Sequence, residues 1–442
     1  MNPENHESNN SLTVELVDLI RQKKILDEDL AACTYFVLDA VVNAIAGTGT
    51  GPGKIIMEWW RAAKSADMGR RAFLGGTLMH TLEMDDLHKR SVTHPGCVVV
   101  PAALAVAAEE GLAGRQMLIA VLRGYEAMCR IGNAAGRAHY RIWHSTATCG
   151  PFGSAMAAGF LLDLSPEQQV WALGNAGTQS AGLWEFMNSG GMSKHLHAGR
   201  AAEAGVLAAD LARSGFTGPA RILEGKQGMF RATCPDADVS ALLDSPEGAW
   251  QLRQTSIKPW PCCRHTHPAI DAALEIFPKV DAGIREVRLR TYQAALDVCD
   301  RPVPGNEYEA KFSLQYCVAA ALDKGKIDFG SFTKSARDES MPTARSVGVE
   351  LSTVSDAAYP ENWGCELEVL TKDGRTLRAD RLHCKGDPEL PLEGDELIAK
   401  AKTLLDHAGI RTREQERLIA YVLDLQNQSG VPDITEFLDI SC

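Results

Sequence analysis

The chain has 442 residues, of which 45% are apolar and 23% charged, and its formal net charge is −12. This length favours two unequal domains, and the composition is normal for a soluble globular protein. A protein that neutralises a phosphate backbone needs a positive balance, so no nucleic-acid partner is expected. The first ten residues lack the order of a signal peptide, and the longest apolar run, Cys97–Ala108, is too short for a bilayer. We therefore predict a cytoplasmic protein without membrane contact.

Helical periodicity runs through the first 243 residues and again after residue 392. The glycine-rich stretch Gly47–Gly53 lacks the spacing of a phosphate-binding loop, and Lys54 is followed by Ile55 instead of Ser or Thr. It is therefore expected to be a plain interhelical loop. The predicted helices are Asp27–Ile45, Arg70–Leu82, Val98–Glu110, Gly114–Ala135, Gly153–Leu162, Pro166–Gly174, Ser193–Arg213, Glu396–His407 and Arg413–Leu425.

After residue 255 polar and apolar residues begin to alternate, as they do in half-buried strands. Asp373-Gly374 between two such runs is typical of a hairpin turn. A helix over Glu309–Leu322 interrupts the strands. The predicted strands are Glu286–Tyr292, Ser346–Ser352, Glu366–Thr371 and Thr376–Leu382. We predict a mainly α protein, in which a large all-helical domain (1–255 and 392–442) carries an inserted, smaller α+β lid domain (256–391).

An acidic helix end precedes two histidines in the first candidate site motif. Glu83, Asp85 and Asp86 are followed by His88 and His94. Carboxylates beside imidazoles can hold a histidine in one tautomer and tune it for proton transfer. A solvated helix end and a metal site remain alternatives, although no tight ligand spacing supports a metal.

Two further motifs stand at expected helix starts. His144 begins a stretch of Ser, Thr and Gly whose backbone N–H groups can face an anion. Ser193 is a candidate N-cap, which would put Lys194 in the first helical turn, where the helix dipole lowers the pKa of a lysine. An exposed lysine and a structural histidine are the plain alternatives.

The fourth motif lies where the texture of the sequence changes and combines Lys258 and Arg264 with His265 and His267. Cys262, Cys263 and the two histidines could also be zinc ligands, but adjacent cysteines chelate one ion poorly and no second cluster accompanies them. The other cysteines are scattered singly, so the twelve in the chain are expected to be buried thiols. Together the four motifs predict a concave site for a small polycarboxylate.

These motifs, with Thr93-His94-Pro95 and the run Lys311–Tyr316, resemble in order the MmgE/PrpD family. The resemblance covers nearly the whole chain. It implies a large helical domain, a smaller α+β domain, a homodimer, and no metal or organic cofactor. It also implies that His94, His144, Lys194, Lys258 and Tyr316 belong to the site, with the acidic helix end.

The family includes 2-methylcitrate dehydratase, cis-aconitate decarboxylase and iminodisuccinate epimerase, and the chain looks most similar to the last. Glu83 and Leu87 stand where the dehydratases and decarboxylases tend to have Asp and Thr. The resemblance therefore implies an isomerase, an epimerase of an amino-polycarboxylate such as iminodisuccinate. The alternatives are a hydro-lyase or decarboxylase of a citrate-like tricarboxylic acid, and a helical scaffold protein without chemistry.

Each site residue is assigned one of two roles. Proton transfer or charge stabilisation is expected from one group, and contact with the substrate from the other. The first group comprises His94, His144, Lys194, Lys258 and Asp86. The second comprises Glu83, His88, Thr93, Ser193, Arg264 and Tyr316.

Overall fold

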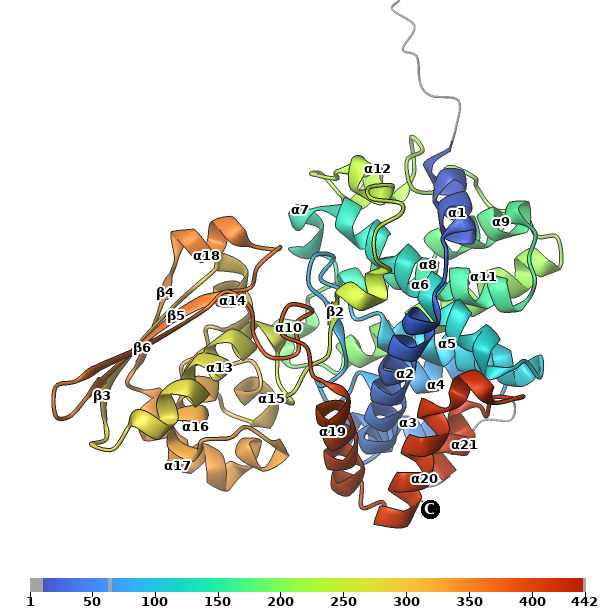
Figure 1. Cartoon of the computed structure of the whole chain (residues 1–442). Coiled ribbons are helices and arrows are strands. Elements are labelled where there is room, and N and C mark those ends of the chain that lie inside the picture. Colours follow the sequence, from blue (N-terminus) through green and yellow to red (C-terminus); the bar gives the residue numbers. More distant parts are fainter. Residues whose placement is uncertain (1–10, 63–65, 440–442) are drawn as a thin grey trace, which may run out of the picture. The chain divides into compact units, whose positions relative to one another are not determined.

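The computed structural model describes residues 11–62 and 66–439, and it is mainly helical (Figure 1). It contains two compact units. Unit 1 holds the residues up to 81, 85–255 and those from 397 onward, and unit 2 holds 82–84 and 256–396. The mainly α fold class, with a helical unit formed by both ends of the chain and a smaller unit that contains the larger sheet, is thus confirmed.

Unit 1 is helical apart from two very short strands, β1 (Leu87–His88) and the first residue of β2 (Thr255–Ser256). Its helices are α1 (Leu12–Gln22), α2 (Asp27–Gly47), α3 (Gly51–Arg61), α4 (Met68–Met79), α5 (Gly96–Glu109), α6 (Gly114–Ala135), α7 (Arg137–Tyr140), α8 (Ser145–Leu161), α9 (Pro166–Gly177), α10 (Phe186–Ser189), α11 (Ser193–Arg213), α12 (Met229–Thr233), most of α19 (Gly394–His407), α20 (Thr412–Leu423) and α21 (Ile434–Asp439), with short 3₁₀ helices η1 (Val239–Leu242), η2 (Gln251–Gln254) and η6 (Leu425–Asn427).

Helix α8 lies at the centre of unit 1 and packs against α5, α6, α9 and α11. Small residues permit this close packing. A Cβ at Gly205 of α11 would lie 2.4 Å from the Cβ of Ser154 of α8, and one at Gly153 would lie 2.9 Å from the carbonyl oxygen of Gly124 of α6. The Ser154 hydroxyl donates to the carbonyl of Ala202 at 2.5 Å and fixes α8 against α11.

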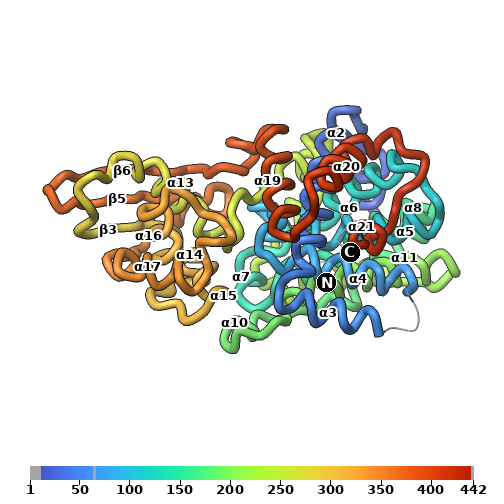
Figure 2. The backbone as a smooth tube through the Cα atoms, turned by 90° about the horizontal axis from the view of Figure 1, so that it is seen from below, coloured from blue at the N-terminus to red at the C-terminus, as the bar shows by residue number. Residues whose placement is uncertain are grey.

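The last helices of the chain pack on α2. Helices α20 and α21 both contact α2, and Figure 2 shows the red C-terminal segment beside the blue one. Lys400 of α19 forms a buried ion pair with Asp39 of α2. Within the described ranges, α2 is the one helix that is long and apolar enough to cross a membrane. The sequence analysis did not single out this helix. Since 78% of its apolar window is buried, as in a core helix, this is weak evidence for a span.

Several predicted boundaries were wrong for local reasons. Helix α4 ends at Met79 instead of Leu82, because His80 caps it and the chain turns there. Helix α8 begins at Ser145, eight residues before the predicted start, and continues through Pro151. The helix predicted over 309–322 is broken, since Ser313 caps a new helix by accepting from the N–H of Tyr316. Of the glycine-rich stretch Gly47–Gly53, predicted to be a loop, only residues 48–50 connect two helices, because Gly47 ends α2 and Gly51–Gly53 form the first turn of α3.

Unit 2 contains a four-stranded sheet in the order β4-β3-β5-β6 (Figure 1), in which β3 runs parallel to β4 and antiparallel to β5. The predicted hairpin is confirmed, because β5 and β6 pair in antiparallel register from Cys365↔Arg381 to Leu370↔Thr376. Helix α13 packs on β5 and β6. The elements are α13 (His267–Ile276), α14 (Gln293–Cys299), α15 (Glu307–Ala310), α16 (Leu314–Lys324), α17 (Lys334–Ala344), α18 (Thr353–Ala358), β3 (Ile284–Thr291), β4 (Val347–Leu351), β5 (Cys365–Thr371) and β6 (Thr376–Arg381), with η3 (Arg264–Thr266), η4 (Phe277–Lys279) and η5 (Phe329–Phe332).

A buried ion network fastens the irregular segment after α12 to α6. Arg130 donates from Nε to Glu126 at 2.8 Å, and its Nη1 donates to the carbonyls of Leu242 at 3.1 Å and Asp244 at 2.7 Å. The ammonium of Lys23 lies 3.1 Å from the same Glu126 carboxylate. Since Arg130 and Glu126 are both buried, each charge depends on the other for its compensation.

We predict that Arg130→Met destabilises the folded chain by about 3–5 kcal/mol, because the change leaves a buried carboxylate and two carbonyls with fewer partners. The measurement is the midpoint of thermal or urea unfolding. Arg115→Met is the matched control on the same helix, since Arg115 forms an exposed ion pair with Asp27 at 3.3 Å, and such pairs contribute at most about 1 kcal/mol. Equal effects of the two substitutions would contradict the assigned role of Arg130.

Candidate functional site

The loop between α4 and α5 carries two backbone positions that ordinary residues avoid. Glu83 has φ 59° and Val92 has φ 50°, both in the left-handed region, although neither is glycine. Each such residue costs about 1–3 kcal/mol and persists where the surrounding structure fixes it, often at functional sites. The side chains that this loop holds therefore need a close description.

Five histidines of unit 1 gather around the end of α4, and we call them the histidine cluster: His80, His94, His144, His195 and His197. The ring centroid of His80 lies 4.7 Å from that of His94, 5.9 Å from that of His144 and 6.2 Å from that of His195. The first four are buried, and His197 is half-buried. The cluster therefore joins the loop after α4, the start of α8 and the start of α11.

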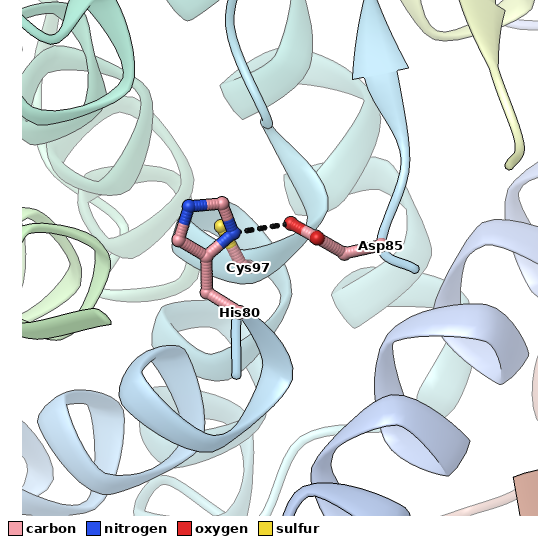
Figure 3. Close-up of side chains that lie close together, drawn as sticks. All are labelled: His80, Asp85 and Cys97. Carbon is pink, nitrogen blue, oxygen red and sulfur yellow. Dashed lines mark hydrogen bonds and ion pairs between the residues drawn. The ribbon is translucent and has the colours of Figure 1, made fainter. Parts of the chain in front are cut away.

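The carboxylate of Asp85 lies between two of these rings. Its Oδ2 atom is 2.7 Å from Nδ1 of His80, the contact drawn in Figure 3, and 3.3 Å from Nδ1 of His94. Burial would raise the pKa of Asp85, but the charges and hydrogen bonds of His80 and His94 outweigh it and hold that pKa well below its usual value. Asp85 is therefore an ionised, buried acceptor.

Acceptor-only partners fix the tautomers of three imidazoles. His80 faces the Asp85 carboxylate, His94 donates from Nδ1 to the carbonyl of Asp86 at 2.6 Å, and His195 donates from Nδ1 to the carbonyl of His80 at 3.1 Å. A carbonyl or ionised carboxylate cannot donate, so Nδ1 carries the hydrogen in each ring. In the neutral form Nε2 is then the basic nitrogen, which suits these rings to take up protons.

Asp86 differs from its neighbour Asp85. Its carboxyl accepts from the hydroxyl of Tyr125 at 2.7 Å and from the N–H of Gly96 at 2.9 Å. Burial, opposed by the Tyr125 hydrogen bond and reinforced by the charge of Asp85, raises the pKa of Asp86 to about 8. Because its side chain holds the start of α5 and its carbonyl holds His94, Asp86 positions other groups.

The other side of the cluster combines two histidines with a lysine. Nδ1 of His144 lies 3.2 Å from Nδ1 of His197. Burial lowers the pKa of His144 well below its usual value, and the charges of His80, Lys194 and His197 add to this effect. Burial and the charge of Lys194 also lower the pKa of His197. Lys194 is itself buried, in the first turn of α11. A buried ammonium beside neutral imidazoles is an arrangement that suits a bound anion.

The remaining predicted residues of unit 1 have structural contacts. His88 and Thr93 pair through their backbones, and Ser91 bridges their side chains at 2.8 and 2.7 Å. Burial, with the charges of two flanking basic residues, lowers the pKa of His88 to about 3. Ser193 is not an N-cap: it is an exposed residue in the first turn of α11, and Met192 occupies the cap position. None of these three is among the rings and charges of the histidine cluster.

Four predicted site residues belong to unit 2. Lys258 is fully buried, its ammonium donates to the carbonyl of Glu83 at 2.7 Å, and the Glu83 carboxylate lies 4.0 Å from it. Arg264, expected to bind a substrate carboxylate, instead pairs with the buried Asp387. The hydroxyl of Tyr316 donates to the carbonyl of Ser331. The Arg264 guanidinium and the Tyr316 hydroxyl are thus engaged inside unit 2.

Sequence reasoning missed His80, His195 and His197. His80 was taken as the interior of a helix that in fact ends one residue before it. His195 and His197 follow Lys194 closely in the sequence but were not selected. The spacing held the signal, since Lys194 and His197 are three residues apart and therefore share one face of α11.

Two groups in the described part of the chain could hold a metal ion by proximity, and the Cys262–His267 motif is not one of them. The first is His80, Asp85 and Cys97 (Figure 3). Its thiol donates to the carbonyl of His94, and burial raises the pKa of Cys97 well above its usual value, whereas a thiolate is the form that binds metals. In the second, His383, Asp387 and Glu389, the carboxylate of Asp387 already pairs with Arg264.

Both parts of the chain match models of one protein family. Residues 15–242 match the model of the MmgE/PrpD N-terminal domain, and residues 260–426 match that of the MmgE/PrpD C-terminal domain. Cis-aconitate decarboxylase of Homo sapiens is 29% identical over 357 residues, which cover 74% of this chain and 71% of the relative. Cis-aconitate decarboxylase of Aspergillus terreus is 25% identical over 409 residues, which cover 85% of this chain and 81% of the relative. That of Mus musculus is 28% identical over 355 residues, which cover 74% of this chain and 70% of the relative.

These relatives overturn the predicted activity. The sequence reading expected an isomerase that epimerises an amino-polycarboxylate such as iminodisuccinate, but the relatives carry the name of a decarboxylase. The epimerase prediction was therefore wrong. Its basis was two departures, Glu83 and Leu87, and single positions in a loop are a weak guide to reaction type when the residues that move protons are common to the family.

We predict that the two adjacent carboxyls respond differently to neutralisation. Asp85→Asn should destabilise the fold by about 3–5 kcal/mol at pH 7, because it removes an ionised acceptor from two imidazoles. Asp86→Asn should cost much less, because a carboxyl with a pKa of about 8 is mostly neutral at that pH. Thermal unfolding of the two variants beside the unchanged chain measures this.

The pH dependence gives an internal control for Asp86. Its pKa of about 8 in the folded chain lies above the unfolded value of about 3.9, so the folded state binds more protons between these limits. The stability contribution of Asp86 therefore falls as pH rises from about 4 and levels off above about 8. Relative to the unchanged chain, Asp86→Asn should gain stability as pH rises from about 4 to about 8, and parallel curves would contradict the raised pKa.

Proposed function

Because this chain belongs to the MmgE/PrpD family, we propose that it is a lyase that removes CO₂ from a small unsaturated tricarboxylic acid such as cis-aconitate. The observation that carries the proposal is the histidine cluster with the buried Lys194 beside it. Decarboxylation needs groups that bind carboxylates and a group that gives a proton to carbon, and the cluster offers both kinds.

The chemistry can be balanced with these groups. The bond between carbon and a carboxylate breaks, CO₂ leaves, and the electron pair spreads onto the oxygens of a conjugated carboxylate. A cation close to those oxygens stabilises the charge most strongly as it develops, which is the role we assign to Lys194. A proton then bonds to carbon, so the net reaction is RCOO⁻ + H⁺ → RH + CO₂.

We assign the proton donor as His144 and give His94 a supporting role. His144 is nearly fully buried (1% exposed), and a tricarboxylate bound beside it would raise its lowered pKa by opposite charge. It would then take up a proton when substrate binds and give it to carbon after CO₂ leaves. His94, whose Nδ1 is held by the Asp86 carbonyl and the Asp85 carboxylate, would donate from Nε2 to a substrate carboxylate in its protonated form.

The remaining assignments rest on the motifs. Lys258 stays a proposed charge-stabilising residue because it belongs to a motif in which the chain resembles the family. Glu83 remains a proposed contact, whereas the partners of Arg264 and Tyr316 favour structural roles for both. A homodimer and a cytoplasmic location also remain predictions.

We predict that the purified chain converts cis-aconitate to CO₂ and a dicarboxylic acid, and that Lys194→Ala lowers turnover at least about a hundredfold while the fold is kept. Isotope-labelled CO₂ and proton NMR of the product measure the reaction. Lys54→Ala is the matched control, because Lys54 also lies in the first turn of a helix, α3, but is exposed.

The product decides between lyase types. Release of CO₂ supports the proposal. Loss or gain of water without CO₂, on a panel of citrate-like acids, would instead make the chain a hydro-lyase. If no acid on the panel reacts, the proposed function is wrong.

Activity should survive dialysis against a strong chelator. The thiol of Cys97 is held in its protonated form and Asp387 is paired with Arg264, so neither group of possible ligands suits an ion. Turnover before and after dialysis, with the metal content of the sample, measures this. Loss of activity that added zinc or iron restores would show that a metal takes part.

A further inference from the structure

The first turn of α8 presents backbone N–H groups that have no acceptor in the described part of the chain. His144 is the N-cap of this helix, and its side chain makes no capping hydrogen bond. The N–H of His144 donates to the carbonyl of Gly182 at 3.0 Å. Those of Ser145 and Thr146 donate to no described residue. A helix leaves its first N–H groups unpaired, so buried ones need a partner from outside the helix.

Two buried hydroxyls stand at the same turn. Ser145 is 4% exposed, and its hydroxyl makes no hydrogen bond within the described residues. Because Ser145 is the first residue of α8 and helical side chains tilt toward the N-terminus, this hydroxyl points to the side where the two N–H groups lie. Thr146 is 0% exposed and accepts from the N–H of His94 at 3.1 Å, which leaves its own hydroxyl hydrogen for another acceptor. The turn thus gathers donors and lacks an acceptor.

The charges beside this turn favour an anion over a neutral ligand. After burial, the charges of His80 and Lys194 contribute most to lowering the pKa of His144, so positive groups surround the start of α8. Asp85, the carboxylate that the histidine cluster already contains, is engaged between His80 and His94. The positive end of the helix dipole adds to these charges. An acceptor with negative charge, such as a carboxylate, therefore suits this turn.

We propose that the first turn of α8 is a carboxylate subsite, in which the N–H groups of Ser145 and Thr146 and the Ser145 hydroxyl donate to one carboxylate of the substrate. This inference rests on the proposed function, since a tricarboxylic acid supplies the group that the turn binds. The subsite holds the substrate beside His144, the proposed proton donor, and leaves its other carboxylates to Lys194 and His94. Several directed hydrogen bonds to one carboxylate also fix the orientation of the bound substrate.

The test removes the donors in two steps. Ser145→Ala removes the hydroxyl alone, whereas Ser145→Pro also removes the backbone N–H. Proline suits this first helical position, because His144 before it is extended, with φ −73° and ψ 104°. The probe is tricarballylate, a saturated tricarboxylate without the double bond that the reaction needs, and calorimetry measures its Kd. We expect Ser145→Ala to raise the Kd about tenfold and Ser145→Pro at least about a hundredfold, because hydrogen bonds to a charged group are strong.

Thr412 offers the matched control. It is an exposed hydroxyl residue at the first position of α20, and Arg411 before it is extended, with φ −67° and ψ 144°. Thr412→Ala and Thr412→Pro therefore make the same chemical changes at a helix start outside the histidine cluster, and they should leave the Kd of tricarballylate unchanged. Thermal unfolding without ligand checks that all four variants are folded.

The outcomes separate the two proposals. If tricarballylate binds and the Ser145 variants weaken it as expected, the subsite is supported, and absence of CO₂ release would then overturn the proposed function alone. If the unchanged chain releases CO₂ but the Ser145 variants keep its affinity for tricarballylate, the subsite alone is overturned, since its donors would serve only bound water. If the unchanged chain neither binds tricarballylate nor releases CO₂, both fail. Should Ser145→Pro not fold, the tenfold change expected for Ser145→Ala decides.

Discussion

The site depends on one buried carboxylate, that of Asp85, held between His80 and His94. Burial of an ionised carboxylate is costly unless charges and hydrogen bonds compensate it, and here the two imidazoles do so. In return the carboxylate sets the tautomer of His80 and shares Nδ1–H of His94 with the Asp86 carbonyl. The strained backbone at Glu83 and Val92 brackets this loop, which is consistent with strain held in place by the compensated charge.

Close helix packing brings the histidines of three segments together. A Cβ at Gly76 of α4 would lie 2.7 Å from the carbonyl of Cys97 and 3.1 Å from that of Ala198, so α4, α5 and α11 meet at backbone distance. A Cβ at Gly199 would lie 2.2 Å from the hydroxyl of Thr77. Larger residues at Gly76 and Gly199 would separate the helix ends that carry His80 and His195. The abundance of small residues is therefore a requirement of the site as well as of the core.

The sequence predicted much of the fold, because long periodic segments such as Gly114–Ala135 and Ser193–Arg213 and the Asp373-Gly374 hairpin carry strong local signals. Motif order was enough to predict the family. The reaction type was not predictable from Glu83 and Leu87, since one pattern of imidazoles and lysines serves several reactions of a carbon beside a carboxylate. His80 was missed because the predicted helix end was wrong and placed it inside a helix. His197 was missed because its contact with His144 depends on tertiary packing.

The two sides of the histidine cluster differ in how their charges are compensated. On the Asp85 side the compensation is internal, because the carboxylate and the two imidazoles that it contacts stabilise one another. On the other side burial and the charge of Lys194 lower the pKa of His144 and of His197, which favours their neutral forms. Under the proposed function, a bound polycarboxylate would supply the negative charge that this second side lacks, so substrate binding would change protonation there and leave the Asp85 side as it is.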